Sequence, residues 1–286
     1  MEKIRFCHSV WTKPMTGSRW YIEDQLKNNL WLFALSVAYV KKFGHEIVLH
    51  TDGLGKEIYG RLPYDEIHLT LDNLNAHERF WAAGKILAQE AEPIGSIHID
   101  GDVFLKKRAV YDIIRDRDAD VIVQMLEGGF SIPYPGSCYG DNLNLVLSAL
   151  NKNIPPEFDR RQDSAYNCGL VKFNNPEPKN RYIKGYKEMI NNCCGDQSFV
   201  KRLIADNNMC PDLIMEQWWL KSVTDHYGYK VKTVLSGHDI NEAAVKIGYT
   251  HVIGTAKYGL ISVVKERLLE IAPDLFTKVE RGISKL

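Results

Sequence analysis

The sequence reads Ser96-Ile97-His98-Ile99-Asp100-Gly101-Asp102, and the apolar residues Val103-Phe104-Leu105 follow directly. The β-compatible residues up to Ile99 predict a strand that ends at an acidic pair. Burying an unpaired carboxylate is costly, so Asp100 and Asp102 need compensation at the end of a sheet strand. A divalent cation is one form of compensation: oxygen ligands suit Mg²⁺ or Mn²⁺, and such a cation can bridge two phosphates of a nucleotide. The other interpretation is a polar turn between two strands, which Gly101 would also suit.

Outward from this run, strand-like and helix-like segments alternate along the chain. Apolar residues at helical spacing over residues 21–43, ending at Gly44, illustrate the helical pattern. The alternation predicts an α/β fold with a Rossmann-type, mostly parallel central sheet and helices on both faces. We expect strands at residues 4–10, 46–51, 66–69, 96–99, 120–123, 169–173 and 230–235, and helices at 21–43, 78–90, 109–115, 141–150, 181–190, 197–205, 216–226 and 260–271.

No linker rich in Pro, Gly or Ser divides the chain, so a single domain is expected over residues 1–286, closed by a C-terminal helix at about 259–280. A loop rich in Gly and Pro is expected over residues 127–140. In sheets of this kind, ligands bind beyond the carboxyl ends of the strands. That rule points to the loops after Val10, Thr51 and Ile99.

Charge and hydropathy limit the partners. The 36 basic and 36 acidic residues give a net charge of zero, which argues against general affinity for nucleic acid. The most apolar run, residues 30–40, is shorter than the roughly 20 residues that cross a bilayer. Residues 1–10 lack the apolar core of a signal peptide. We therefore expect a cytoplasmic protein without a transmembrane segment, with peripheral membrane contact left open. The six cysteines form no C-x-x-C pair, so free thiols are expected rather than a zinc site.

A second motif lies near the end of the chain, where residues 251–257 read H-x-x-G-x-x-K. A neutral imidazole such as that of His251 is a common metal ligand. Gly254 lets the backbone come close to a bound group, and Lys257 offers a point charge to a phosphate. The plainer interpretation is a core histidine and a solvated lysine.

Together, the D-x-D and H-x-x-G-x-x-K motifs resemble those of glycosyltransferases with the GT-A fold, in particular family 8. The resemblance implies that Asp100, Asp102 and His251 hold Mn²⁺, or Mg²⁺, and that Lys257 and Gly254 contact a diphosphate. It also implies metal-dependent transfer of a hexose from a nucleoside-diphosphate sugar, by family habit a UDP-sugar, with retention of configuration. The acceptor would be a hydroxyl of a saccharide or glycolipid, as in the synthesis of a surface polysaccharide.

Weaker matches extend the resemblance. Lys85 precedes Asp100 by 15 positions, where the family has a basic residue at the donor. Asn167-Cys168-Gly169 is similar to the family's N-(A/S)-G step beside the sugar, with Cys168 as a departure. The aromatic residues that usually follow the motif lysine are absent, because Tyr258-Gly259 stands there.

The family also carries an acid followed by Gln near the anomeric centre, and this chain offers two such pairs. Asp196-Gln197 keeps the family's acid, whereas Glu216-Gln217 is followed by the expected helix and strand. The second pair is favoured, and the first stays open.

Four further residues are candidates for the donor site. Asp52 could contact the base or ribose, although a turn residue at Asp52-Gly53 is the favoured interpretation. Ser9 could face the nucleotide or be a plain loop serine. Arg79 and Trp81 could line the donor site, although helix packing also accounts for Trp81.

Three rival functions remain. In a phosphatase of the haloacid dehalogenase type, Asp100 would be the nucleophile and Asp102 the acid/base. That motif normally stands at the start of the catalytic domain, whereas about a hundred residues precede it here. A nucleotidyltransferase would need a Gly- and base-rich loop after the first strand, where residues 9–14 carry only Lys13. A catalytically inactive sugar-nucleotide-binding protein would have little reason to keep both motifs intact.

Overall fold

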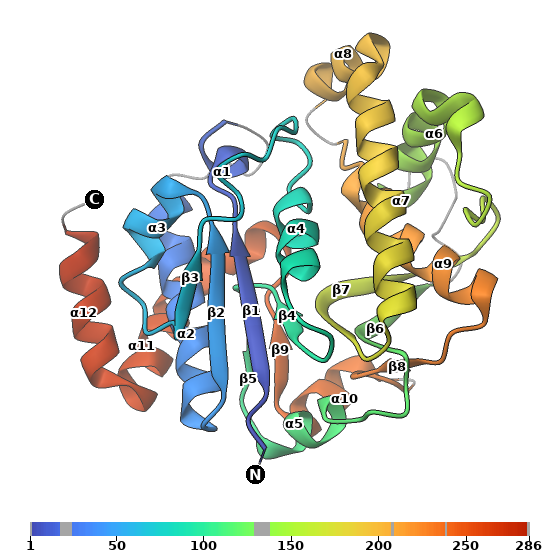
Figure 1. Ribbon diagram of the computed structural model, residues 1–286. Coiled ribbons are helices and arrows are strands. Elements are labelled where there is room, and N and C mark those ends of the chain that lie inside the picture. The colour runs from blue at the N-terminus through green and yellow to red at the C-terminus, as the bar shows by residue number, and fades with distance from the viewer. Residues whose placement is uncertain (1, 18–24, 129–137, 207–208, 238, 285–286) are drawn as a thin grey trace.

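In the computed structural model (Figure 1), the residues described are 2–17, 25–128, 138–206, 209–237 and 239–284. The first residues of the helix expected from residue 21, and most of the loop expected over residues 127–140, lie outside these ranges.

A seven-stranded central sheet organises the chain in the order β3-β2-β1-β4-β7-β6-β8 (Figure 1). The first four strands are parallel to one another, and β6 is parallel to β8. Only β7 is reversed, and it pairs antiparallel with both β4 and β6. The expected mostly parallel sheet is therefore confirmed. Its strands are β1 (Arg5–Val10), β2 (Glu46–Thr51), β3 (Glu66–His68), β4 (Ile97–Ile99), β6 (Val121–Gly128), β7 (Ser164–Phe173) and β8 (Val231–Thr233).

Helices flank the sheet because its strands present apolar side chains to two separate cores. Ile122 packs into one core while its neighbours Val121 and Val123 pack into the other. Such alternation follows from the two-residue period of a strand. One core includes α2 (Gln25–Lys42), α11 (Ile261–Ile271) and α12 (Pro273–Ile283). The other includes α4 (Ala83–Ala91), α6 (Cys138–Leu150), α7 (Pro176–Gly195), α8 (Gln197–Ala205) and α9 (Trp219–Tyr227).

A small second sheet joins the two sequence motifs. Strand β5 (Val103–Leu105) follows the D-x-D tripeptide, and β9 (Tyr249–His251) ends at the motif histidine. The two strands pair antiparallel, with Val103 opposite His251. This pairing brings positions about 150 residues apart in sequence to one place.

Several elements differ from expectation. The expected C-terminal helix is two helices, because Pro273 has no N–H to continue α11 and instead begins α12. A π-helix, Leu213–Trp218, precedes α9 where an α-helix was expected from residue 216. The elements that were not expected are β9, α1 (Lys13–Gly17), α3 (Gly53–Tyr59), α10 (Ile240–Ile247) and the 3-10 turns Asn151–Asn153 and Gly254–Leu260. The expected helix at residues 109–115 is α5 (Arg108–Ile114).

Within the described residues, every helix is too short or too polar to span a bilayer. The cysteines whose side chains are described, Cys7, Cys168, Cys193, Cys194 and Cys210, are free thiols.

Candidate functional site

A cleft of about 440 Å³ opens at the carboxyl ends of β1 and β4. Its volume falls in the range of small-molecule sites. The wall from α2 and the segment after β1 is mostly apolar, with the carboxamides of Gln25 and Asn29 as exceptions, and the polar wall comes from α4, β7 and the π-helix. Residues that line the cleft include Ser9, Gln25, Asn29, Phe33, Trp81, Lys85, Asp100, Gly101, Asp102, Asn167, Gly169, Cys210, Gln217, His251, Gly254 and Lys257.

The D-x-D tripeptide forms a tight turn between β4 and β5 at the cleft. The N–H of Asp100 donates to the carbonyl of Gly169 at 2.9 Å, and the N–H of Val103 donates to the carbonyl of Asp100 at 3.0 Å. Gly101 is required because a Cβ there would lie 2.2 Å from the ring of Phe33. The polar-turn interpretation therefore holds for the backbone, and the same turn presents two carboxylates to the cleft.

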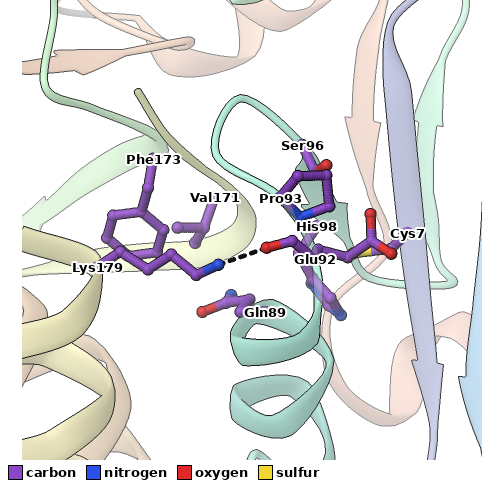
Figure 2. A pocket seen from close by; sticks show the side chains of 9 residues that line it. All are labelled: Cys7, Gln89, Glu92, Pro93, Ser96, His98, Val171, Phe173 and Lys179. Carbon is purple, nitrogen blue, oxygen red and sulfur yellow. Dashed lines mark hydrogen bonds between the residues drawn. The ribbon is translucent and has the colours of Figure 1, made fainter. Parts of the chain in front are cut away.

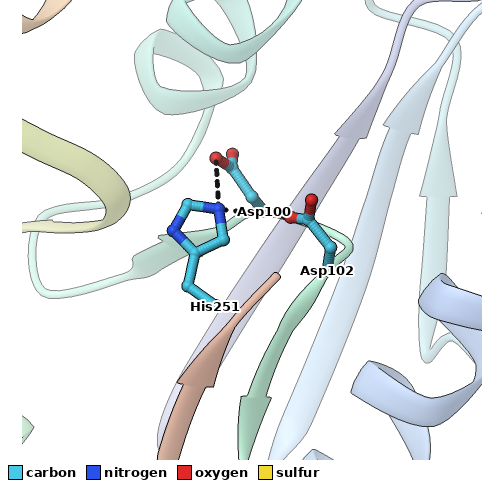
Figure 3. Close-up of side chains that lie close together, drawn as sticks. All are labelled: Asp100, Asp102 and His251. Carbon is cyan, nitrogen blue, oxygen red and sulfur yellow. Dashed lines mark ion pairs between the residues drawn. The ribbon is translucent and has the colours of Figure 1, made fainter. Parts of the chain in front are cut away.

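Asp100, Asp102 and His251 form a cluster of three potential metal ligands (Figure 3). One ligand atom from each lies within 4.8 Å of the others. The Nε2 atom of His251 is 3.4 Å from Asp102 Oδ1 and 4.0 Å from Asp100 Oδ2. Ligands around Mg²⁺ or Mn²⁺ lie about 3 Å apart when each is about 2.1 Å from the ion. The donor set thus fits a divalent cation after small side-chain movements.

The other ring nitrogen of His251 faces the protein interior. Its Nδ1 lies 2.8 Å from the Oε1 of Gln124, a buried side chain of β6. The hydroxyl of Tyr249 donates to the same oxygen at 2.8 Å. Nε2 is therefore the nitrogen that faces both carboxylates.

Lys257 lies against the cluster from the side of the Gly254–Leu260 turn, with its Nζ 3.2 Å from Asp102 Oδ2. Burial disfavours the charged form of Asp102, but Lys257 and His251 outweigh burial and hold the pKa of Asp102 well below its usual range. The pKa of His251 is raised: burial lowers it, and the negative charge of Asp102 more than offsets that effect. Asp102 is therefore ionised, and its charge is stabilised by the neighbouring Lys257 and His251.

Lys85 links the cluster to the polar wall. This buried lysine places its Nζ 2.9 Å from Asp100 Oδ1, 2.7 Å from Glu216 Oε1 and 3.2 Å from the carbonyl oxygen of Cys168. Burial opposes its charge, but Asp100 and Glu216 prevail, and the pKa of Lys85 is raised. Asp100 thus has a positive partner even without a cation.

Glu216 lies on the π-helix and is fully buried. Short π-helical segments are frequent at functional sites. Burial raises its pKa to about 7, against the opposing charge of Lys85. Although Lys85 is close enough for an ion pair, neither carboxylate oxygen of Glu216 accepts a well-formed hydrogen bond from the described residues. The ion pair is its main compensation.

Gln217 follows Glu216 and lines the cleft, where its Oε1 lies 2.5 Å from the hydroxyl of Tyr139. The same hydroxyl lies 2.7 Å from Glu127 Oε2, and Glu127 Oε1 accepts from the side-chain amide of Asn167 at 2.6 Å. Side chains of β6, β7, α6 and the π-helix are thereby connected along the polar wall.

The structure separates the two acid–Gln pairs. Asp196 caps α8 and accepts from the N–H groups of Ser198 and Phe199, and neither Asp196 nor the exposed Gln197 lines the cleft. An Asp before a helix is a common N-cap. Glu216 and Gln217 are the pair that the fold brings to Asp100.

Of the other predicted site residues, some line the cleft and some do not. Ser9 lines the cleft, 2.9 Å from His98 Nε2, and Gly254 lines it with a φ of 71°. Asp52 instead caps α3 and accepts from both the N–H and the hydroxyl of Thr12, away from the cleft lining.

On α4 and the segment before it, Trp81 lines the cleft and its Nε1 lies 3.3 Å from Cys210 Sγ. Arg79 is buried but does not line the cleft.

Sequence reasoning missed several cleft or cluster residues, among them Gln25, Asn29 and Gln124. Gln25 and Asn29 are buried carboxamides one helical turn apart on α2, and Gln25 Oε1 accepts no hydrogen bond among the described residues. Two carboxamides within a largely apolar helical segment could have indicated from the sequence that this helix borders a polar site. Gln124 had no such signal, because its partner His251 is distant in sequence.

A second hollow is lined by residues of the strands β1, β4 and β7 and of the helices α4 and α7 (Figure 2). Its volume is only about 10 Å³, which is room for a single water molecule. Gln89 and Ser96 line it with polar atoms that have no partner among the described residues. It is too small for a substrate.

Among curated proteins, none matches the sequence. A family model described as "Family of unknown function (DUF6734)" matches residues 4–281, and the chain therefore belongs to that family.

Proposed function

We propose that the protein is a metal-dependent glycosyltransferase with a GT-A-like fold that uses a nucleoside-diphosphate hexose, with UDP as the first candidate nucleotide. The observation that carries the proposal is the meeting of both sequence motifs at one cleft. Asp100, Asp102 and His251 offer hard oxygen and imidazole ligands within 4.8 Å of one another, and Lys257 adds a positive charge beside them.

The fit of this site to a diphosphate is electrostatic. Asp100, Asp102 and His251 would hold the cation, which when bound supplies Lewis-acid stabilisation of charge on the departing diphosphate. Lys257 contributes a fixed positive charge on the same side of the cleft. Its ion pair with Asp102 keeps the ammonium at the cluster before any ligand binds.

The polar wall is suited to a sugar. Gln217 and Asn167 line the cleft and are held by Tyr139 and Glu127, so their amides have fixed positions for sugar hydroxyls. Lys85 keeps Asp100 in place through two contacts, at 2.9 and 3.2 Å. Retention of configuration and a saccharide or glycolipid acceptor are parts of the proposal that rest on the resemblance to family 8.

The phosphatase alternative gives Asp100 a different task. As a nucleophile, Asp100 would attack with a carboxylate whose two oxygens both face the ammonium of Lys85, and this ion pair lowers its nucleophilicity. This contact favours the transferase.

The test is release of nucleoside diphosphate from a panel of sugar nucleotides with Mn²⁺, measured for the protein and for Asp102→Asn. Asp118→Asn, which changes an exposed aspartate, is the matched control. Donor turnover that is lost in Asp102→Asn and kept in Asp118→Asn supports the proposal. Hydrolysis of an aryl phosphate without donor turnover would support the phosphatase instead.

A further inference from the structure

Gln124 is a buried carboxamide that contacts the candidate metal ligand His251 from the side opposite the carboxylates. Its Oε1 lies 2.8 Å from His251 Nδ1 and accepts from the Tyr249 hydroxyl at 2.8 Å. Gln124 comes from β6, whereas Tyr249 and His251 come from β9. The contact therefore joins the central sheet to the small sheet that carries the histidine.

The fold leaves space for this contact at Gly169 of β7. A Cβ at Gly169 would lie 2.4 Å from Gln124 Oε1 and 2.6 Å from His251 Nδ1, closer than side-chain atoms can approach. Glycine at this position thus serves the packing of the histidine and its amide partner. Three segments converge on one hydrogen bond.

We propose that Gln124 is a positioning residue for metal binding, which selects the ring nitrogen that His251 presents to the cation. A neutral imidazole carries one N–H. An acceptor beside Nδ1 keeps the proton there, so the lone pair of Nε2 is directed at Asp100 and Asp102. The inference rests on the proposed function in taking this cluster as a cation site.

The amide oxygen of Gln124 is the atom that lies beside both the Tyr249 hydroxyl and His251 Nδ1. A carbonyl oxygen has two lone pairs and can accept from both the Tyr249 hydroxyl and the Nδ1–H of His251. If the amide nitrogen stood there instead, it would donate to Nδ1. The ring proton would then be on Nε2, pointing at Asp102, and the cation would lose its third ligand.

The first measurement is Mn²⁺ affinity by electron paramagnetic resonance for the full chain and three variants. Gln124→Met removes the acceptor at similar length and should weaken Mn²⁺ binding about 10- to 100-fold, as loss of partners to metal-ligating histidines does. Gln124→Glu can only accept and should bind Mn²⁺ nearly as well as the parent. Gln89→Met, which alters a buried glutamine at the small hollow, is the matched control and should bind as the parent does.

The second measurement is a long-range ¹H–¹⁵N correlation spectrum of the unmodified protein at alkaline pH, without metal and with diamagnetic Mg²⁺. The proposal predicts that Nδ1 of His251 carries the proton in both. Protonation at Nε2, or Mn²⁺ binding by Gln124→Met as tight as the parent's, would overturn it.

The outcomes also separate this inference from the proposed function. If the unmodified protein binds no Mn²⁺, the proposed function fails, and the metal-free spectrum still decides the tautomer. If Gln124→Met does not fold, Gln124→Glu and the spectra decide alone.

Discussion

Replacing Lys85 with methionine should be strongly destabilising, because this lysine compensates two carboxylates at once. Its Nζ lies 2.9 Å from Asp100 Oδ1 and 2.7 Å from Glu216 Oε1, and Glu216 is fully buried. Removing one partner of a buried ion pair costs about 3–5 kcal/mol, since the other charge is left uncompensated. The Asp100 side chain is 23% exposed and partly solvated, so we expect the lower end, about 3 kcal/mol. For a chain of this size that is a fall in Tm of roughly 5 °C.

The pH dependence sharpens this expectation. Burial already raises the pKa of Glu216 to about 7 with Lys85 present, and loss of the lysine raises it further. The folded variant therefore keeps a proton that the unfolded chain releases above its ordinary carboxyl pKa of about 4.3, and its stability falls as pH rises from there to beyond 7. The loss relative to the parent should be smallest in acid and largest at alkaline pH.

The assay is urea unfolding at several pH values for the parent, Lys85→Met and the double variant Lys85→Met/Glu216→Gln. Neutralising Glu216 should recover a large part of the lost stability, because it removes the uncompensated buried charge. A loss below about 1 kcal/mol for Lys85→Met, the cost of an exposed pair, would refute this reasoning. A double variant no more stable than the single one would also refute it.

Other predictions follow from packing and burial. Gly101→Ala should cost about 1–3 kcal/mol by overpacking, since the new Cβ would lie 2.2 Å from the Phe33 ring; Gly195→Ala, which meets no atom within 4 Å, is its control in the same thermal unfolding experiment. Burial raises the pKa of Asp212 to about 7 although Ala82 N–H and Tyr186 donate to it, so the folded state holds a proton that the unfolded chain has released. Its contribution to stability should therefore be lost as pH rises from about 4 to 7, by a few kcal/mol. Asp212→Asn should flatten that part of the stability–pH curve, and an unchanged slope would contradict the assignment.

Local patterns in the sequence predicted the strand that leads into the D-x-D motif, but not β9 or the 3-10 turn that carry the H-x-x-G-x-x-K motif. The strand before Asp100 ends where expected, and α8 has the predicted bounds of residues 197–205. The central sheet followed from the alternation of helices and strands, because burial on both faces imposes that pattern. The reversal of β7 could not be predicted, since strand direction depends on the path of the connecting chain.

Long-range contacts account for most of what sequence reasoning missed. Strand β9 has only three residues and exists because it pairs with β5, about 150 positions earlier. Gln124 meets His251 only in the folded chain, and no motif contains it. The choice between Asp196 and Glu216 was also decided by long-range contacts. The helix and strand that follow Glu216-Gln217 favoured that pair in the sequence, and the folded chain places Glu216 beside Lys85 while Asp196 caps α8.

The most direct test of the central claim is calorimetry with UDP, GDP, CDP and ADP, with and without Mn²⁺, on the full chain and on Asp102→Asn. The account predicts that at least one diphosphate binds, that binding requires Mn²⁺, and that Asp102→Asn abolishes it while Asp118→Asn does not. Absence of binding for all four diphosphates in the presence of Mn²⁺, or equal binding by Asp102→Asn, would contradict it.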